Sequence, residues 1–175
     1  MATIPVPFPD SYWVIPARFL AGEYPGTFEM DGAARHKLRA MLRAGITRWI
    51  DLTEPGELRA YQPLLVEEAR RLEIAIQHTR FPIQDRGVTG QAGMIAILDV
   101  IDSSLAAGQA IYVHCWGGIG RTGTVVGCYL VRHGLLGESA LVELDRLRRH
   151  VPDAWRSSPE TNSQFEMILS WKIGM

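Results

Sequence analysis

Apolar residues recur along the chain at two spacings, one typical of buried strands and one typical of amphipathic helices. From Asp31 to Ala44 they recur every three or four positions, and Gly45 follows as a stop signal. The short apolar run at 110–113 is typical of a strand buried on both faces. On these criteria we expect strands at 11–15, 18–22, 46–52, 74–78 and 110–113, and helices at about 31–44, 62–72, 91–107, 120–133, 138–150 and 161–173.

The alternation of strands with helices predicts an α/β fold with a central, mostly parallel sheet of about 4–5 strands flanked by helices. A Gly-rich loop separates the buried strand from the helix that begins near residue 120. The sequence has no internal repeat, linker or low-complexity tract. We therefore expect a single domain over residues 1–175, in which residues 1–30 form an extended N-terminal segment.

Composition narrows the class of function. With 18 Lys and Arg against 19 Asp and Glu, the formal net charge is −1, which is poor support for binding nucleic acid or an anionic membrane. No apolar run approaches the roughly 18–20 residues that span a bilayer. The first ten residues lack a basic residue and contain three prolines, unlike a secretory signal. We expect a cytoplasmic, monomeric protein that binds neither nucleic acid nor membrane.

The two cysteines, Cys115 and Cys128, are too few for a disulfide framework and lack the partners of a zinc site. No cluster of His, Asp and Glu stands at metal-ligand spacing, so we expect no metal and no cofactor. Cys128 is flanked by apolar residues, which favours a core position. The alternative is that it traps Cys115 in a protective disulfide on oxidation.

Chemistry-bearing residues concentrate in one loop, His114-Cys-Trp-Gly-Gly-Ile-Gly-Arg-Thr-Gly123. In open α/β sheets, ligands bind at the carboxyl ends of strands beside a helix N-terminus, where unpaired N–H groups favour an anion. Gly117, Gly118 and Gly120 allow consecutive amides to turn towards one point. The loop is therefore predicted to surround a phosphate-sized oxyanion.

Cys115 opens this loop as a candidate nucleophile, and the helix N-terminus and Arg121 would stabilise its thiolate. The guanidinium of Arg121 can bind two oxygens of a phosphoryl group. The Thr122 hydroxyl can hydrogen-bond the sulfur, and His114 is expected to orient the loop through its ring nitrogens. A histidine before a cysteine and a basic residue six positions after it occur together by chance in about 0.6% of chains of this composition. The alternative is a Gly-rich turn that contains a packed cysteine.

The motif His114-Cys115-x5-Arg121-Thr122-Gly123 resembles the signature loop of the cysteine-dependent protein tyrosine phosphatase superfamily. The short chain is similar to the dual-specificity branch, including its small bacterial members. Pro82-Ile-Gln-Asp85, thirty residues before the cysteine, resembles the general-acid loop of that branch. The segment Pro159-Glu-Thr-Asn-Ser-Gln164 resembles the Pro-x-Thr-x-x-Gln segment whose glutamine positions the hydrolytic water in some members.

This resemblance implies a metal-independent phosphomonoester hydrolase that forms a phosphocysteine on Cys115. Arg121 and the amides of 116–121 would stabilise the phosphoryl oxygens, and Asp85 would act first as acid and then as base. Gln164 would position the hydrolytic water. The residues expected to bind substrate are Trp116, Gly117, Gly118, Ile119, Gly120 and Arg121. The expected partner is a phosphoprotein or phosphopeptide, and phosphate-type or vanadate-type anions would occupy the loop.

Several residues have a second interpretation. An aspartate in a Pro/Gly loop, such as Asp85, is often a turn residue that accepts backbone hydrogen bonds. Asp51 and Glu54, at the end of a strand, are further candidates for the cleft. Arg86 either touches substrate or is a solvated surface residue, and Trp116 and Ile119 either border the mouth of the site or pack beneath it.

Phosphotyrosine is the first expectation for the substrate, with phosphoserine and phosphothreonine in addition. The loop residues 116–120 are all uncharged, whereas phosphoinositide-directed members of the superfamily tend to carry lysines there. Three other functions stay open on the sequence alone. They are phosphatase activity on small phosphate esters or phosphoinositides, a rhodanese-like sulfurtransferase activity, and non-catalytic binding of phosphopeptides.

Overall fold

The computed structural model describes residues 4–27 and 31–175, and a five-stranded sheet forms its centre. The strands are β1 (Ser11–Ile15), β2 (Phe19–Gly22), β3 (Ile46–Asp51), β4 (Gln77–Arg80) and β5 (Ala110–His114), in the spatial order β1-β2-β5-β3-β4. β1 pairs antiparallel with β2, and the other three neighbouring pairs are parallel. The predicted α/β fold with a mostly parallel sheet is confirmed.

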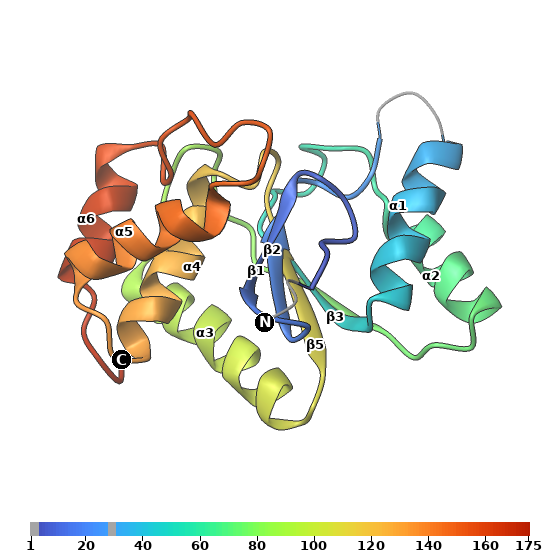
Figure 1. Cartoon of the computed structure of the whole chain (residues 1–175), viewed down its shortest axis with the longest axis horizontal. Coiled ribbons are helices and arrows are strands. Elements are labelled where there is room, and N and C mark those ends of the chain that lie inside the picture. Colours follow the sequence, from blue (N-terminus) through green and yellow to red (C-terminus); the bar gives the residue numbers. More distant parts are fainter. Residues whose placement is uncertain (1–3, 28–30) are drawn as a thin grey trace.

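Helices cover both faces of this sheet (Figure 1). They are α1 (Asp31–Arg43), α2 (Gln62–Arg71), α3 (Gln91–Ala106), α4 (Gly120–Arg132), α5 (Gly137–Arg148) and α6 (Asn162–Ser170). One buried cluster joins the α1–α2 layer to the sheet through Leu38, Leu65 and Trp49. A larger cluster, with Leu98 and Val126 among its members, fills the space between the sheet and the layer of α3 to α6. The two clusters hold β5 between them, buried along its whole length.

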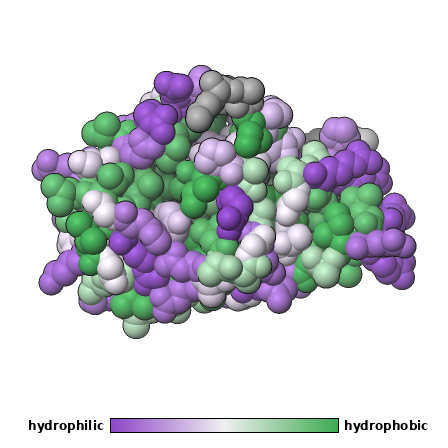
Figure 2. All heavy atoms as spheres, turned by 60° about the horizontal axis from the view of Figure 1, so that its bottom comes forward, coloured by the Kyte–Doolittle hydropathy of each residue, from purple (hydrophilic) through white to green (hydrophobic). Residues whose placement is uncertain are grey.

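The surface agrees with the balanced composition. Figure 2 shows hydrophobic and hydrophilic residues interspersed over one face, with hydrophilic residues at the outer end of the α1–α2 layer. Within residues 4–27 and 31–175, no helix combines the length and the apolar character needed to cross a membrane.

One strand lies further along the chain than its apolar pattern predicts. The expected strand at 74–78 is β4 at Gln77–Arg80, whereas Ile74 and Ile76 pack against the α1–α2 core as irregular chain. Pairing with β3 sets this position, because Arg48 lies opposite Gln77 and Asp51 lies opposite Arg80. The last helix is also shorter than expected, because Trp171 has extended backbone angles (φ −66°, ψ 149°) and ends α6 at Ser170.

The carboxyl ends of the parallel strands meet at one edge of the sheet, where the Gly-rich loop begins. Asp51, the last residue of β3, lies in register with His114, the last residue of β5. The end of β2 supports the same loop, because a Cβ at Gly118 would lie 2.3 Å from the carbonyl carbon of Gly22. Gly118 also has a φ of +69°, so glycine is required at this position for two reasons.

Candidate active site

The Gly-rich loop joins buried β5 to the N-terminus of α4, as predicted. Cys115 directly follows β5 and is 3% exposed. No side chain caps the start of α4, so its first N–H groups keep their capacity to bind an anion. The loop opens onto a cavity of about 400 Å³, which we call the catalytic cavity. Its lining residues are Asp85, Arg86, Trp116, Gly117, Ile119, Arg156 and Glu160.

Arg121 is 2% exposed, and carboxylates hold its guanidinium in place. Its Nη1 donates to Glu57 Oε2 at 2.8 Å and to the carbonyl oxygen of Ile83 at 2.9 Å. Its Nη2 donates to Glu57 Oε1 at 2.6 Å and to Asp85 Oδ1 at 3.0 Å. Burial opposes its charge, but the hydrogen bonds to Glu57 and the charges of Cys115 and Asp85 outweigh burial and raise the pKa of Arg121. The guanidinium is therefore a fixed cation.

This arrangement leaves one edge of the guanidinium for a ligand. A guanidinium has five N–H groups, and here the four on Nη1 and Nη2 have partners. Nε donates to none of the residues that the structure describes. Glu57 bridges Nη1 and Nη2, so the edge formed by Nε and Nη2 is the one that can bind two phosphoryl oxygens. Asp85 occupies the Nη2 half of that edge.

Glu57 is the site residue that the sequence reasoning missed. It lies in the loop after β3, three residues beyond Glu54, which the pattern proposed instead. Glu54 is exposed, is absent from the lining of the catalytic cavity and donates its backbone N–H to Glu57 Oε2. The hydrogen bonds from Arg121 lower the pKa of Glu57, which is therefore ionised at neutral pH. Two glutamates in one polar loop were the only signal in the sequence.

Asp51, which the sequence analysis named with Glu54 as a candidate for the cleft, lies beneath the Gly-rich loop and not at its mouth. It is 1% exposed and accepts from Arg80 Nη2 at 2.7 Å and from Thr53 Oγ1 at 2.7 Å. Burial alone would raise the pKa of Asp51, but the neighbouring imidazole of His114, which becomes cationic only in acid, and the hydrogen bonds from Thr53 and Arg80 lower it. Asp51 is thus a buried carboxylate that supports the end of β5.

His114 connects that buried layer to the loop. Its Nδ1 lies 3.0 Å from the carbonyl oxygen of Cys115, and its Nε2 lies 2.7 Å from the Tyr61 hydroxyl. Burial lowers the pKa of His114, so the ring is neutral at pH 7. Since the carbonyl can only accept, Nδ1 carries the proton and Nε2 accepts from Tyr61. Tyr61 in turn accepts from His78 Nε2 at 3.1 Å. The contacts agree with the expected orienting role of His114.

The segment before α6 packs against the loop from the other side. Gln164 is fully buried, and its Oε1 accepts from the N–H groups of Glu160 and Thr161 in a capping box. Its Nε2 donates at 3.0 Å to the carbonyl oxygen of Gly87, in the loop of Asp85. A Cβ at Gly120 would lie 3.1 Å from this amide and 2.5 Å from Glu160 Oε2. Gln164 therefore links the loop of Asp85 to the Gly-rich loop, and its role towards water stays a prediction.

The Thr122 hydroxyl and the Cys128 thiol are both buried. The predicted hydrogen bond from Thr122 to the sulfur is not present, because the buried Thr122 hydroxyl has no hydrogen-bond partner among the described residues. Cys128 is fully buried in the α3–α6 core, and burial raises its pKa to about 12. The core position expected for Cys128 is confirmed, and both cysteines are free thiols.

The remaining loop residues divide between the mouth and the interior. Trp116 is 51% exposed and lines the catalytic cavity, whereas Ile119 lines it from below at 1% exposure. Arg86 lines the same cavity. Glycine was expected at position 117 because a Cβ would collide there. The structure shows no such collision, because a Cβ at Gly117 would contact only Ile119, at an ordinary 3.6 Å. In the part of the chain that the structure describes, no three His, Cys, Asp or Glu residues form a group that could hold a metal ion.

A Cys-x5-Arg loop between the central strand and a buried helix, with an acidic loop against the arginine, defines a cysteine-dependent protein tyrosine phosphatase or dual-specificity phosphatase. The sequence comparison reaches the same class. The chain belongs to the family described as "Polymorphic toxin system, DSP-PTPase phosphatase", whose model matches residues 25–135. The protein is therefore a phosphatase-type hydrolase.

Two longer phosphatase proteins are similar in sequence to part of this chain. The chain is 31% identical over 101 residues to mouse protein tyrosine phosphatase domain-containing protein 1, a match that covers 54% of this chain and 13% of the relative. It is 28% identical over 130 residues to mouse dual specificity protein phosphatase CDC14B, a match that covers 71% of this chain and 24% of the relative. The chain thus spans less than a quarter of these longer proteins.

Solved structures agree with the fold over most of the chain. The active form of Tk-PTP has a TM-score of 0.69 at 23% identity and covers 92% of this chain and 95% of its own. The kinase associated phosphatase has a TM-score of 0.69 at 22% identity, with coverage of 86% and 83%. PTPMT1 in complex with PI(5)P has a TM-score of 0.66 at 20% identity, with coverage of 91% and 93%.

Proposed function

We propose that this phosphatase hydrolyses phosphotyrosine in proteins or peptides, with phosphoserine and phosphothreonine as further substrates, through a phosphocysteine on Cys115. The observation that carries the proposal is the edge of Arg121 formed by Nε and Nη2, which Glu57 and the carbonyl of Ile83 leave for a ligand. A phosphoryl group bound there would lie at the loop that Cys115 opens.

In the first step, the Cys115 thiolate attacks phosphorus, so that an S–P bond forms as the ester P–O bond breaks. Arg121 and the N–H groups at the start of α4 stabilise the charge on the phosphoryl oxygens. Asp85 gives its proton to the departing ester oxygen. For this step Asp85 must exchange its contact with Arg121 for one with the leaving group, because the two share the same guanidinium edge.

In the second step, water attacks phosphorus and the S–P bond breaks, which releases phosphate and regenerates the thiolate. Asp85 accepts the proton from that water. Gln164 lies between Gly87 and Gly120, and we assign it a positioning role in this step, for which its amide must exchange a present backbone partner for the water.

The catalytic cavity supports an aromatic phosphoester as substrate. Trp116 presents a half-exposed ring at the mouth, against which a phosphotyrosine ring can pack. The uncharged loop at 116–120 does not favour a polyphosphorylated headgroup. Arg86 and Arg156 nevertheless line the rim, and the fold is shared with PTPMT1, which was solved with PI(5)P. Phosphoinositides are therefore the competing substrate class. Family membership disfavours the sulfurtransferase alternative.

The test is phosphate release from matched phosphotyrosine, phosphoserine and phosphothreonine peptides, from short-chain phosphoinositides and from small phosphate esters, with EDTA present and Cys115→Ser as the blank. The proposal predicts the highest kcat/KM on phosphotyrosine peptides, and no activity in the variant. A higher kcat/KM on phosphoinositides would overturn the substrate assignment. Thiosulfate turnover without phosphate release would overturn the reaction itself.

A further inference from the structure

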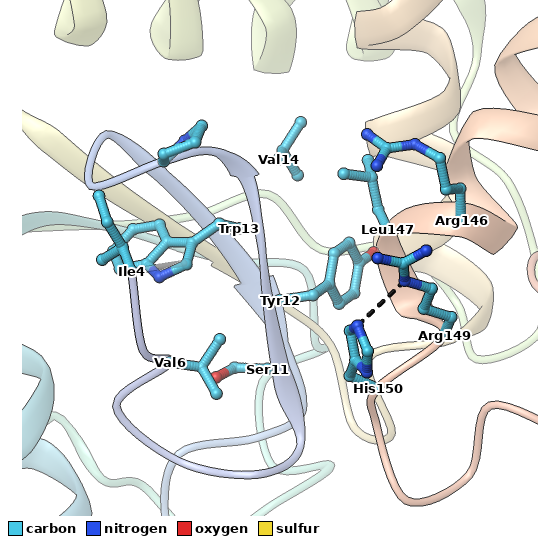
Figure 3. A pocket seen from close by; sticks show the side chains of 11 residues that line it. Ile4, Val6, Ser11, Tyr12, Trp13, Val14, Arg146, Leu147, Arg149 and His150 are labelled. Atoms are coloured by element: carbon cyan, nitrogen blue, oxygen red, sulfur yellow. Dashed lines mark hydrogen bonds between the residues drawn. The ribbon is translucent and has the colours of Figure 1, made fainter. Parts of the chain in front are cut away.

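A second cavity, of about 650 Å³, lies between the edge strand β1 and the C-terminal end of α5 (Figure 3). We call it the β1–α5 pocket. It shares no lining residue with the catalytic cavity, and no step proposed above uses it. Its volume is in the range of pockets that enclose a small organic ligand.

One wall of the β1–α5 pocket is apolar. Ile4 and Val6 line it and are 42% and 38% exposed, so two large aliphatic side chains face the opening. Val14 and the ring of Trp13 continue this wall, and the indole Nε1 is satisfied because it donates to the carbonyl oxygen of Pro5 at 3.2 Å. The wall therefore offers hydrocarbon contact and no free polar group from Trp13.

The opposite wall, on α5, is cationic (Figure 3). Arg146 is neutralised there by Glu143, through bonds of 2.6 Å and 2.7 Å. Arg149 has no ion-pair partner in the described ranges 4–27 and 31–175, and its Nε donates only to His150 Nε2, at 3.0 Å. Its terminal Nη groups are therefore free to bind an anion.

Tyr12 lies between the two walls and supplies a second unpaired donor. Its side chain is 4% exposed and points from β1 towards α5 (Figure 3). Its hydroxyl is buried and has no hydrogen-bond partner among the residues described. Burial raises the pKa of Tyr12, so the hydroxyl stays protonated and can donate. The hydroxyl oxygen has almost no accessible surface, so a ligand in the pocket reaches it only when the side chains that cover it move, and the hydroxyl can then donate to an acceptor.

We propose that the β1–α5 pocket binds the free carboxylate of a medium-chain fatty acid, whose head group contacts Arg149 and Tyr12 and whose chain lies on Ile4, Val6 and Val14. The Nη groups of Arg149 and the Tyr12 hydroxyl are donors, so a ligand that contacts them must offer acceptors. A carboxylate with an alkyl chain matches both walls.

The test compares octanoate with 1-octanol, which has the same chain without the charge, by NMR titration of the whole protein. We expect octanoate to bind more tightly, and Arg149→Gln to weaken octanoate binding about five-fold while binding of 1-octanol is unchanged. Tyr12→Phe should also weaken the binding of octanoate. Arg70→Gln, which removes an exposed arginine from α2, is the matched control and should change neither ligand.

Folding and activity serve as controls for these variants. Arg149 lies outside the catalytic cavity, so Arg149→Gln should keep the wild-type phosphatase rate. Equal affinity for octanoate and 1-octanol, or unchanged octanoate binding in Arg149→Gln, would overturn the proposal. A concentration-dependent dimer that Arg149→Gln disrupts would also overturn it, because the pocket would then hold a second copy of the chain. None of these outcomes depends on whether the proposed phosphatase substrate is correct.

Discussion

Arg121 and Glu57 are joined by two parallel hydrogen bonds, of 2.8 Å and 2.6 Å, although 64 residues separate them in the chain. This pair fixes the plane of the guanidinium and leaves the Nε–Nη2 edge for a phosphoryl group. The loop after β3 thus sets the geometry of a site whose nucleophile follows β5.

Substitution of Glu57 tests this dependence. Glu57→Gln keeps the size of the side chain but replaces one acceptor of the pair by a donor, which faces the N–H groups of Arg121. A misplaced phosphate-binding group costs on the order of 100-fold in rate, so we expect a fall in kcat/KM of about 10-fold to 100-fold. Steady-state kinetics with a phosphotyrosine peptide measure it.

Glu54→Gln is the matched control for that variant, because Glu54 is an exposed glutamate in the same loop. It should keep at least most of the wild-type kcat/KM. If the two variants behave alike, or if Glu57→Gln is fully active, then Glu57 does not position Arg121 for catalysis.

Asp85 has two opposing effects, since it shares the ligand edge of Arg121 at 3.0 Å and is also the proposed acid. Asp85→Asn should lower kcat by about 100-fold or more for esters with poor leaving groups and flatten the alkaline limb of the pH profile. The same variant should bind vanadate at least as tightly as the wild type, because a neutral amide competes less for the guanidinium. Weaker vanadate binding, or an unchanged alkaline limb, would place the acid elsewhere.

Gly118 is predicted to tolerate no side chain. In Gly118→Ala the new Cβ would meet the backbone of Gly22 at 2.3 Å, and alanine would be strained at a φ of +69°. We expect loss of activity together with a lower free energy of unfolding, measured by urea denaturation. Gly117→Ala is the control, because the space at that position is open apart from an ordinary contact with Ile119. Equal effects of the two substitutions would contradict the role of Gly118.

Acid should destabilise the protein through the buried His114 and the half-buried His78. Burial lowers the pKa values of His114 and His78 from 6.5, so in the folded state both rings stay neutral when the unfolded chain already binds protons. Because the unfolded state then holds more protons, stability falls as pH decreases below about 6.5, by up to about 1.4 kcal/mol per pH unit for each ring. The lowered pKa of Asp51 also makes stability fall with acid, but only below about pH 3.8.

Urea denaturation at pH 7.5, 6.5 and 5.5 measures this loss. His78→Gln keeps a donor to Tyr61 but removes one titrating ring, and should make the decline with acid shallower. A free energy of unfolding that is constant or rises between pH 7.5 and 5.5 would contradict the neutral state of these histidines.

The sequence predicted those parts of the site that are local in the chain. Cys115 and Arg121 lie in one loop, and strand and helix patterns on either side of it are strong, so the fold and the place of this loop were predictable. Glu57 was not, because an acidic residue in a polar loop has no periodicity that marks it. Its role arises only when β3 and β5 are paired in the sheet.

Contacts between distant parts of the chain also explain the other differences between the expected and the observed structure. β4 begins at Gln77 because it pairs with β3, whereas the apolar residues Ile74 and Ile76 point to an earlier strand. The hydrogen bond between His114 and Tyr61 joins residues 53 positions apart. Gln164 was expected to act on water, whereas the spacing Thr161-x-x-Gln164 is the sequence signature of the capping box that the structure shows at the start of α6.

The phosphocysteine is the central claim, and a rapid denaturing quench at alkaline pH of the enzyme with a ³²P-labelled phosphotyrosine peptide tests it most directly. We expect a burst of label on the peptide that contains Cys115, stable in alkali and lost in mild acid, as an S–P bond requires. Cys115→Ser should show no turnover while it still binds vanadate. Label on another residue, or turnover in Cys115→Ser, would contradict the account.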